Sequence, residues 1–207
     1  MTRQEDAYLM LLDLAAASSA TLNETKVAKL LYLADLRAQR HGDLGSGSDW
    51  FWHNHGPWDR ALPGVRLALV AAQRVVQERF SLGWGVFERS VRLPRRCDAV
   101  ERVDLQARLQ GYGYHLLAVV NEFGQLTASE LRDYTYDTAP MLKVQETGTR
   151  GIDLDLSAMD ERDCWGLVTT SELSQRQADA NRHVDAEHVK RLHGELKTQR
   201  SLADVLR

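Results

Sequence analysis

The segment Leu22-Asn23-Glu24-Thr25-Lys26-Val27-Ala28-Lys29-Leu30-Leu31-Tyr32-Leu33-Ala34-Asp35 decides the fold, because its hydrophobic residues recur at the spacing of an α-helix. Thr21 and Glu24 have the spacing of a capping box, which satisfies free amides at a helix start. Gly42 lies where the helix needs a left-handed residue to end. The predicted apolar face contains Val27, Leu30, Leu31, Ala34 and Ala38. The opposite face presents Lys26, Lys29, Tyr32, Asp35 and Arg37.

Outward from this segment, the hydrophobic pattern remains mostly helical. It predicts helices over about residues 5–18, 59–77 and 104–123. Asp104 is the predicted cap of the last of these, and Gly111 and Gly113 fall inside it. Thr127 and Glu130 form a second capping box, which predicts a short helix to about residue 134.

Two regions have the pattern of strands. The residues between 76 and 93 flank Gly83-Trp84-Gly85, which predicts a small β-hairpin. Residues 152–156 alternate between apolar and acidic side chains and predict an edge strand. Trp50-Phe51-Trp52 is predicted to be extended and to lead into a turn at Gly56-Pro57. The predicted fold class is therefore mainly α: a compact helical domain with a small β-hairpin and a C-terminal helical extension.

The chain is predicted to divide into a domain over residues 1–156 and a polar extension over residues 157–207. Residues 174–181 contain almost no large apolar side chain, so this stretch cannot form a core of its own. The extension ends in a predicted amphipathic helix that carries Val189, Leu192, Leu196, Ala203 and Leu206. This helix either packs back on the domain or orders on a partner.

Composition excludes several classes of protein. The chain has 207 residues, a mean hydropathy of -0.40 and no apolar run long enough to span a membrane. Its first residues lack the pattern of a signal peptide. The two cysteines, Cys97 and Cys164, stand alone without a C-x-x-C or a zinc spacing, which is typical of a reducing compartment. We therefore expect a cytoplasmic protein without a membrane partner.

The net charge of -3 is unevenly distributed. Residues 1–65 contain 6 basic and 8 acidic residues, and residues 111–207 contain 11 and 16. Residues 66–110 contain 9 basic residues, all arginine, and 5 acidic ones, so this middle segment carries +4. A basic segment of this kind binds either phosphate or an acidic partner protein.

No motif for catalysis or cofactor binding is present. The chain has no G-x-S-x-G elbow, no recognisable cysteine nucleophile and no phosphate-cradling glycine loop. His53 and His55 could bind a metal ion from one side of an extended segment, with His41 or Asp49 as a third ligand. The alternative is that these imidazoles pack with aromatic side chains around the Gly-Pro turn. We expect no enzymatic activity, no metal and no cofactor.

The tryptophans suggest another kind of site. Trp50, Trp52, Trp58 and Trp84 all lie in or next to loops that flank the predicted third helix. They either close the core beneath these loops or anchor a protein partner.

Three segments together resemble a known family. Residues 22–35 are similar to the K-L-L-Y-x-A-D helix of the Panacea domain, also called the SocA-like antitoxin domain. In that family a glycine-containing loop, an aromatic segment and a Gly-Pro turn follow, as Gly42, residues 50–52 and residues 56–58 do here. Residues 121–136 resemble the second signature, a helix ending in Phe-Gly and then a short capped helix. Tyr136 replaces the usual histidine, and Pro140 matches the family's proline.

The resemblance covers about residues 5–150 and implies an antitoxin of a bacterial or phage toxin–antitoxin pair. Such proteins neutralise a co-encoded toxin by direct binding, and their toxin partners are diverse. One relative acts as an adaptor that delivers its toxin to a cellular protease. The family brings no cofactor and no catalytic residue.

We expect the toxin to bind the polar face of the second helix and the loop after it. The candidate partner-binding residues are Lys26, Lys29, Tyr32, Asp35, Trp52, His53, His55, Trp58 and Asp59. A local role is the alternative, in which Tyr32 and Asp35 hydrogen-bond the Gly-Pro loop. Two other functions stay open: a DNA-binding regulator of its own operon that uses the arginine-rich segment, and a metal-dependent hydrolase that uses His53 and His55.

Overall fold

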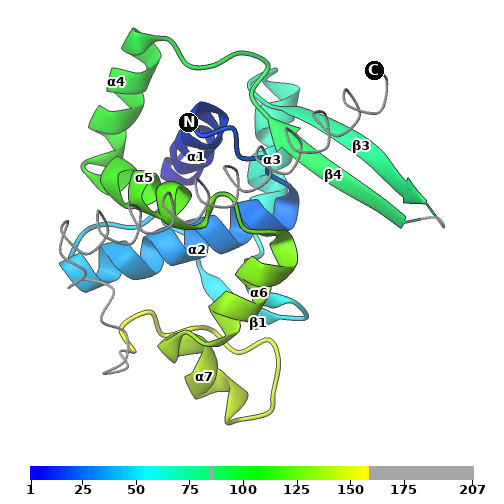
Figure 1. Ribbon diagram of the computed structural model, residues 1–207. Coiled ribbons are helices and arrows are strands. Elements are labelled where there is room, and N and C mark those ends of the chain that lie inside the picture. The colour runs from blue at the N-terminus through cyan, green and yellow to red at the C-terminus, as the bar shows by residue number, and fades with distance from the viewer. Residues whose placement is uncertain (84–85, 159–207) are drawn as a thin grey trace, which may run out of the picture. The chain divides into compact units, whose positions relative to one another are not determined.

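The computed structural model describes residues 1–83 and 86–158, which belong to one compact unit (Figure 1). The unit is mainly α, as predicted, and its described part has two small antiparallel hairpins rather than one. The predicted C-terminal helix lies outside the described residues. The helices are α1 (Arg3–Ala17), α2 (Glu24–His41), α3 (Leu62–Ala71), α4 (Ala99–Leu109), α5 (Tyr112–Phe123), α6 (Ala128–Tyr136) and α7 (Ala139–Gln145). The strands are β1 (Trp50–His53), β2 (Gly56–Asp59), β3 (Val76–Gly83) and β4 (Val86–Arg92).

The start of α2 differs from the prediction. The cap is Asn23, whose side chain accepts a hydrogen bond from the Lys26 amide at 2.8 Å, so the predicted capping box of Thr21 and Glu24 is wrong. Glu24 is instead the first helical residue. The predicted end is confirmed, because Gly42 adopts a left-handed conformation with φ of 71°. The capping box of Thr127 and Glu130 at α6 is also confirmed.

The long helix predicted over 104–123 is two helices. Gln110 and Gly111 both adopt positive φ angles, 49° and 90°, and this left-handed pair ends α4 and starts α5. The cap of α4 is Asp98, so the prediction of Asp104 as a cap is wrong. Gly111 is needed for the break between the helices. The third helix is also shorter than predicted, because residues from Val76 onward form β3.

The hairpin predicted over 76–93 is confirmed as β3 and β4. It extends away from the helices in Figure 1, and the Val91 amide ties its base to the Leu22 carbonyl at 3.0 Å. The first hairpin along the chain, β1 and β2, was not predicted. It pairs the segment that was expected to be extended with the Gly-Pro segment. The predicted strand at 152–156 is partly present: the Trp52 amide bonds the Ile152 carbonyl, and the Leu154 amide bonds the Trp50 carbonyl.

Helix α2 lies at the centre of the unit. It packs against α1, α5 and α6 and contacts both hairpins (Figure 1). Every residue from Lys26 to Leu36 is buried. Because α2 is covered on both sides, its polar side chains are enclosed together with its apolar ones and need hydrogen-bond partners.

Asp35 shows how this need is met. Its carboxylate is 3% exposed and accepts four hydrogen bonds. The Ser46 amide and hydroxyl donate at 2.7 and 2.6 Å, the Trp50 indole N–H at 2.8 Å and the Tyr112 hydroxyl at 2.5 Å. One side chain of α2 therefore fixes the loop after it, strand β1 and helix α5.

We expect Asp35→Ala to lower the free energy of unfolding by about 3–5 kcal/mol, because it leaves buried donors without an acceptor. Urea denaturation followed by tryptophan fluorescence measures this change. In a double-mutant cycle, Tyr112→Phe should cost less in the Asp35→Ala background than in the wild type, by about 1 kcal/mol. Additive costs would show that the Tyr112 hydroxyl is not coupled to Asp35.

Candidate interaction surface on the first hairpin

Strand alternation gives the β1–β2 hairpin two different faces. Trp50 and Trp52 point toward the helices, where their indole N–H groups donate to Asp35 and, at 3.5 Å, to the Tyr136 hydroxyl. Phe51, His53, Trp58 and Arg60 share the opposite side, which we call the hairpin face. The cross-strand pairing of Phe51 with Trp58 places them side by side.

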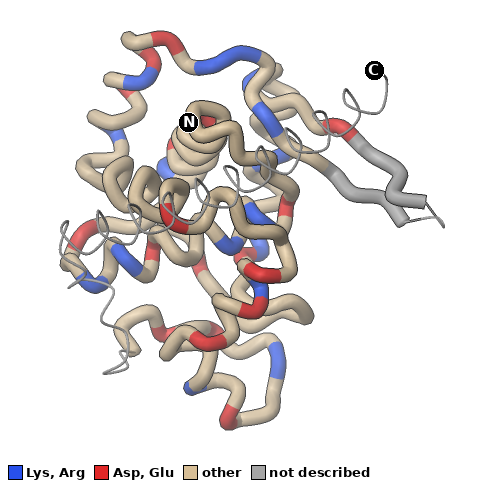
Figure 2. Tube along the Cα trace, viewed as in Figure 1, with Lys and Arg blue, Asp and Glu red and all other residues tan. Residues whose placement is uncertain are grey.

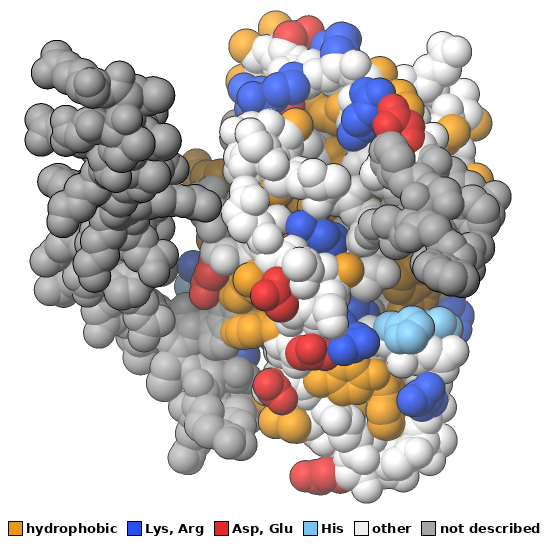
Figure 3. Space-filling model, turned by 45° about the vertical axis from the view of Figure 1, so that its right-hand side comes forward, with side chains coloured by type: hydrophobic (Ala, Val, Ile, Leu, Met, Phe, Trp, Pro, Cys, Tyr) orange, Lys and Arg blue, Asp and Glu red, His pale blue; other side chains and the backbone are white. Residues whose placement is uncertain are grey.

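The hairpin face is aromatic and basic. The His53 ring lies 5.8 Å from Phe51 and 6.0 Å from Trp58 between ring centroids. The Arg60 guanidinium covers the Phe51 ring at 4.0 Å, and 66% of the Arg60 side chain is exposed. Trp58 is half-buried, and His53 and His55 are exposed. On the side of the molecule in Figure 3, histidine side chains reach the surface among basic and hydrophobic ones.

The hairpin is held against α2 at the free edge of β2. Lys29 Nζ donates to the Pro57 carbonyl at 2.7 Å. This carbonyl points away from β1, since Trp52 opposite it bonds the segment 151–152 instead. Proline is suited to an edge strand because it has no amide to satisfy there. The lysine therefore takes the place of a neighbouring strand.

Lys29 is enclosed without a carboxylate partner in the described part of the chain. It is 1% exposed, and burial lowers its pKa to about 7, with the positive charge of Arg132 as a second cause. Gly56 has φ of 91°, and a Cβ atom on it would lie 3.3 Å from both Lys29 Nζ and the Thr135 hydroxyl. A glycine is thus required where the turn approaches the lysine.

The other predicted residues of α2 are also internal. The Lys26 ammonium donates to the Gly124 carbonyl at 2.9 Å, and the Tyr32 hydroxyl shares a hydrogen bond with Thr138 at 2.7 Å. The prediction of an exposed polar face on α2 is therefore wrong: Lys26, Lys29, Tyr32 and Asp35 lie in the interior because α6 and the hairpin cover them.

The predicted partner-binding residues of the loop fall into a buried group and an exposed group. Trp52 and Asp59 are buried, and the Asp59 carboxylate accepts hydrogen bonds from Gln4 and the Ala61 amide. His53, His55 and Trp58 reach the surface. The alternative prediction was a local role, in which residues of α2 hydrogen-bond the Gly-Pro loop. Such a bond is present, but it is made by Lys29 and not by Tyr32 or Asp35.

Three members of this surface were missed by sequence reasoning. Phe51 and Arg60 belong to the hairpin face, and the period of two along β1 and β2 was the signal that could have found them. Arg150 joins the turn from a distant loop by donating to the Asn54 side chain at 2.9 Å. No local pattern could place Arg150 there, because 96 residues separate the partners.

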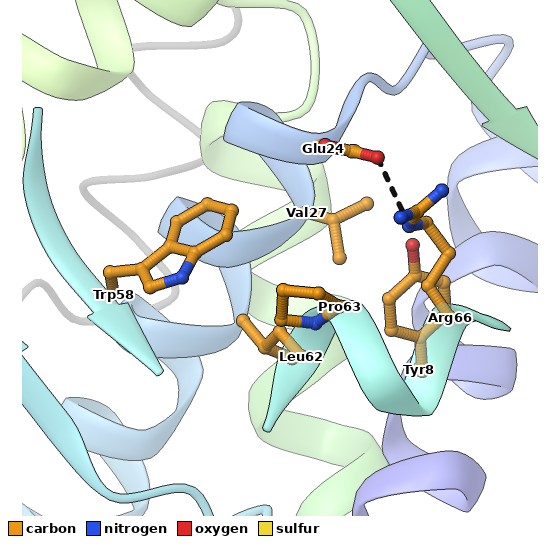
Figure 4. A pocket seen from close by; sticks show the side chains of 7 residues that line it. All are labelled: Tyr8, Glu24, Val27, Trp58, Leu62, Pro63 and Arg66. Atoms are coloured by element: carbon orange, nitrogen blue, oxygen red, sulfur yellow. Dashed lines mark ion pairs between the residues drawn. The ribbon is translucent and has the colours of Figure 1, made fainter. Parts of the chain in front are cut away.

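A small pocket adjoins the hairpin face. Trp58 lies across it from Tyr8 and Arg66 (Figure 4). The Arg66 guanidinium pairs with Glu24 at 3.0 Å, drawn as a dashed line in Figure 4. The pocket is lined by residues of α1, α2, β2 and α3, namely Tyr8, Glu24, Val27, Trp58, Leu62, Pro63 and Arg66.

The metal-site hypothesis finds no cluster to support it. Among residues 1–83 and 86–158, no group of three histidine, cysteine, aspartate or glutamate side chains is arranged to hold a metal ion. His41 lies instead at the end of α2, where it stacks on His115 with 5.3 Å between ring centroids. In the same part of the chain, no helix is long and apolar enough to cross a membrane.

The arginines of residues 66–110 are mostly paired with acids. Figure 2 shows basic and acidic residues interspersed along the segment leading into α4 and along α4 itself. Two buried carboxylates on α1, Asp6 and Asp13, receive arginines from this segment. The pairs are Arg66–Glu24, Arg92–Glu78, Arg95–Glu101, Arg96–Asp13, Arg102–Asp13 and Arg108–Asp6. Three acids from outside the segment, Glu24, Asp13 and Asp6, thus offset most of its net charge of +4.

Comparison of the chain with protein-family models, curated proteins and solved structures found no match.

The low pKa of Lys29 predicts a pH-dependent stability. The ordinary lysine pKa is 10.5, so between pH 7 and pH 10.5 the unfolded chain holds a proton that folded Lys29 lacks. Unfolding then takes up a proton, and stability rises with pH in this window by at most about 1.4 kcal/mol per unit. Below pH 7 Lys29 holds its proton in both the folded and the unfolded chain, so it adds no pH dependence to the stability.

We expect the wild type to gain about 1–2 kcal/mol over Lys29→Met between pH 7.5 and pH 9. Urea denaturation at the two pH values measures the gain. Lys143→Met, at an exposed lysine, is the matched control and should keep the wild-type slope. Parallel curves for wild type and Lys29→Met would mean that Lys29 stays charged when buried.

Proposed function

We propose that this chain is an antitoxin that neutralises a co-encoded toxin protein by binding it directly, with the hairpin face as the docking surface. One observation carries the proposal. The three segments that resemble the Panacea domain are residues 22–35, residues 50–58, and residues 121–136 with Pro140, which together span residues 121–140. They are hydrogen-bonded to one another beneath a surface that exposes histidine and arginine side chains and part of Trp58.

The bonds link all three segments. Residues 22–35 bond the hairpin twice and residues 121–140 twice, and the hairpin bonds residues 121–140 through Trp52. The donor and acceptor pairs are Lys29–Pro57, Trp50–Asp35, Lys26–Gly124, Tyr32–Thr138 and Trp52–Tyr136. The segments quoted for the resemblance therefore act together as a scaffold, which supports assigning them to one module.

The hairpin face has the composition of a protein interface. Tryptophan and arginine are enriched where protein partners bind, and they dominate the binding free energy when they lie near the centre of a contact. Trp58 lies on β2, and Arg60 directly follows the end of that strand, two residues further along the chain. Both side chains reach the surface. Delivery of the bound toxin to a protease would use the same contact and belongs to the proposal as a second mode.

The alternative of a DNA-binding regulator has less support. Its phosphate contacts were expected from the arginines of residues 66–110, and those whose side chains the structure describes are paired with acids. Exposed positions of α3, the helix before the β3–β4 hairpin, are Pro63, Gly64, Leu67, Ala68 and Ala71. None of them is basic, so this helix offers no exposed cationic side chain to a DNA backbone.

A co-expression experiment tests the main proposal. The gene next to this one is induced in a bacterial host with and without the chain, and growth and copurification are measured. We expect the neighbouring product to be toxic alone, harmless with the chain present, and recovered in a complex with it. A neighbour that is not toxic, or that is toxic and never binds, contradicts the proposal.

The location of the contact is tested by substitution. We expect His53→Ala with Arg60→Gln to weaken binding of the toxin at least about tenfold, or about 1.4 kcal/mol. Arg95→Gln is the matched control, because the Arg95 side chain is 65% exposed and lies on the loop before α4. Calorimetric titration of the purified toxin measures both. Equal losses in the two variants would place the toxin elsewhere.

A further inference from the structure

We propose that the turn of the β1–β2 hairpin docks an acidic segment of a partner protein, recognised by His53, His55 and Arg150. This inference rests on the proposed function and deepens it, because it names the chemistry that the toxin presents to this surface.

Basic groups from separate parts of the chain meet at this turn. His53 and His55 lie in the turn itself, and Arg150 reaches it from the loop before the residues that pair with β1. Lys29 of α2 lies directly beneath Gly56. Arg132 of α6 is close enough to Lys29 to act on its charge. The turn is therefore surrounded by basic groups on several sides.

These groups lack the acidic partners that other basic residues have. Among the side chains that the structure describes, those of residues 1–78 and 90–158, no carboxylate lies at ion-pair distance from Lys29, His53, His55 or Arg150. The arginines of residues 66–110, by contrast, mostly pair with acids. Two acids do lie in the surroundings, but Asp133 pairs with Arg132 at 2.6 Å and Asp153 with Arg60 at 3.9 Å. Basic groups without an acidic partner are thus concentrated at the turn.

The ionisation of His53 reports the same imbalance. Its pKa is lowered first by burial and then by His55, Lys29 and Arg150, all of which are basic. An acidic ligand at the turn would oppose these neighbours and raise the pKa of His53. Binding is therefore coupled to proton uptake by the protein and should strengthen as the pH falls.

The groups that would contact the ligand are held in place before it arrives. Arg150 donates to the Asn54 side chain at 2.9 Å and lies over the Trp52 ring at 5.9 Å. The Tyr136 hydroxyl fixes the Asn54 carbonyl at 3.4 Å. Pre-organised side chains lose less conformational entropy on binding, which favours a specific contact over a diffuse charged surface.

An acidic peptide tests the proposal without any toxin. The full chain, labelled with ¹⁵N in its histidines, is titrated with octaglutamate while the imidazole NMR signals are followed, with His53→Gln used for assignment. We expect the His53 and His55 signals to move and the pKa of His53 to rise. His41 and His115, which stack on each other away from the turn, should stay unmoved.

The variant His55→Gln with Arg150→Gln should bind octaglutamate at least about fivefold more weakly than the wild type. Both positions are exposed, and circular dichroism checks that the variant is folded. Arg95→Gln is the matched control and should bind like the wild type. Equal binding by the double variant, equal movement of all histidine signals, or equal effects of octalysine would overturn the proposal.

Inorganic sulfate forms the last arm of the test. If it moves the His53 signal as strongly as octaglutamate does, the turn is a small-anion site and the docking proposal is wrong. The outcome is independent of the co-expression result. Peptide binding with no toxic neighbour would support the acidic docking site and reject the antitoxin function. Neutralisation without peptide binding would support the antitoxin function and reject the acidic docking site.

Discussion

The carboxylate of Asp35 is the constraint on which the rest of the unit depends. Burial raises its pKa, and the hydrogen bonds from Ser46, Tyr112 and Trp50 oppose that rise. A carboxylate so enclosed is tolerated only if its oxygens are fully hydrogen-bonded. The loop after α2, strand β1 and helix α5 must therefore all stay at fixed distances from one residue of α2. The position of the first hairpin follows from this requirement together with the Lys29–Pro57 bond.

Two kinds of basic residue can be distinguished in this chain by their partners. Arginines around α4 pair with acids of α1 and of α4 itself, so they hold these helices together and add little net charge to the surface. At the hairpin turn, Lys29, His53, His55 and Arg150 have no such partners in the described part of the chain. Net charge along the sequence points to residues 66–110 as the basic region, whereas the fold places the uncompensated charge at the turn. Pairing, rather than composition, decides which surface attracts an anion.

Much of the fold could be predicted because helix periodicity and caps are local signals. The end of α2 at Gly42 and the start of α6 at Thr127 follow from single residues. The break at Gln110 and Gly111 was missed because the apolar period continues across it. Periodicity also separates the two faces of α2 without showing that α6 and the hairpin cover the polar one. That face was therefore mistaken for a surface. Arg150 could not be found at all, since only the folded chain brings it to Asn54.

The burial of the motif residues changes what the motifs can predict. Lys29, Tyr32 and Asp35 belong to the segment that suggests an antitoxin, and none of them is available to a partner in the folded chain. These three residues determine the position of the hairpin. Its exposed side chains, such as His53 and Arg60, are not among the residues quoted for the resemblance. A scaffold of this kind can present different surface residues without changing its interior, which is how one module could serve diverse partners. If the chain is an antitoxin, its motifs therefore predict how the docking surface is held, and His53, His55 and Arg150 predict what docks there.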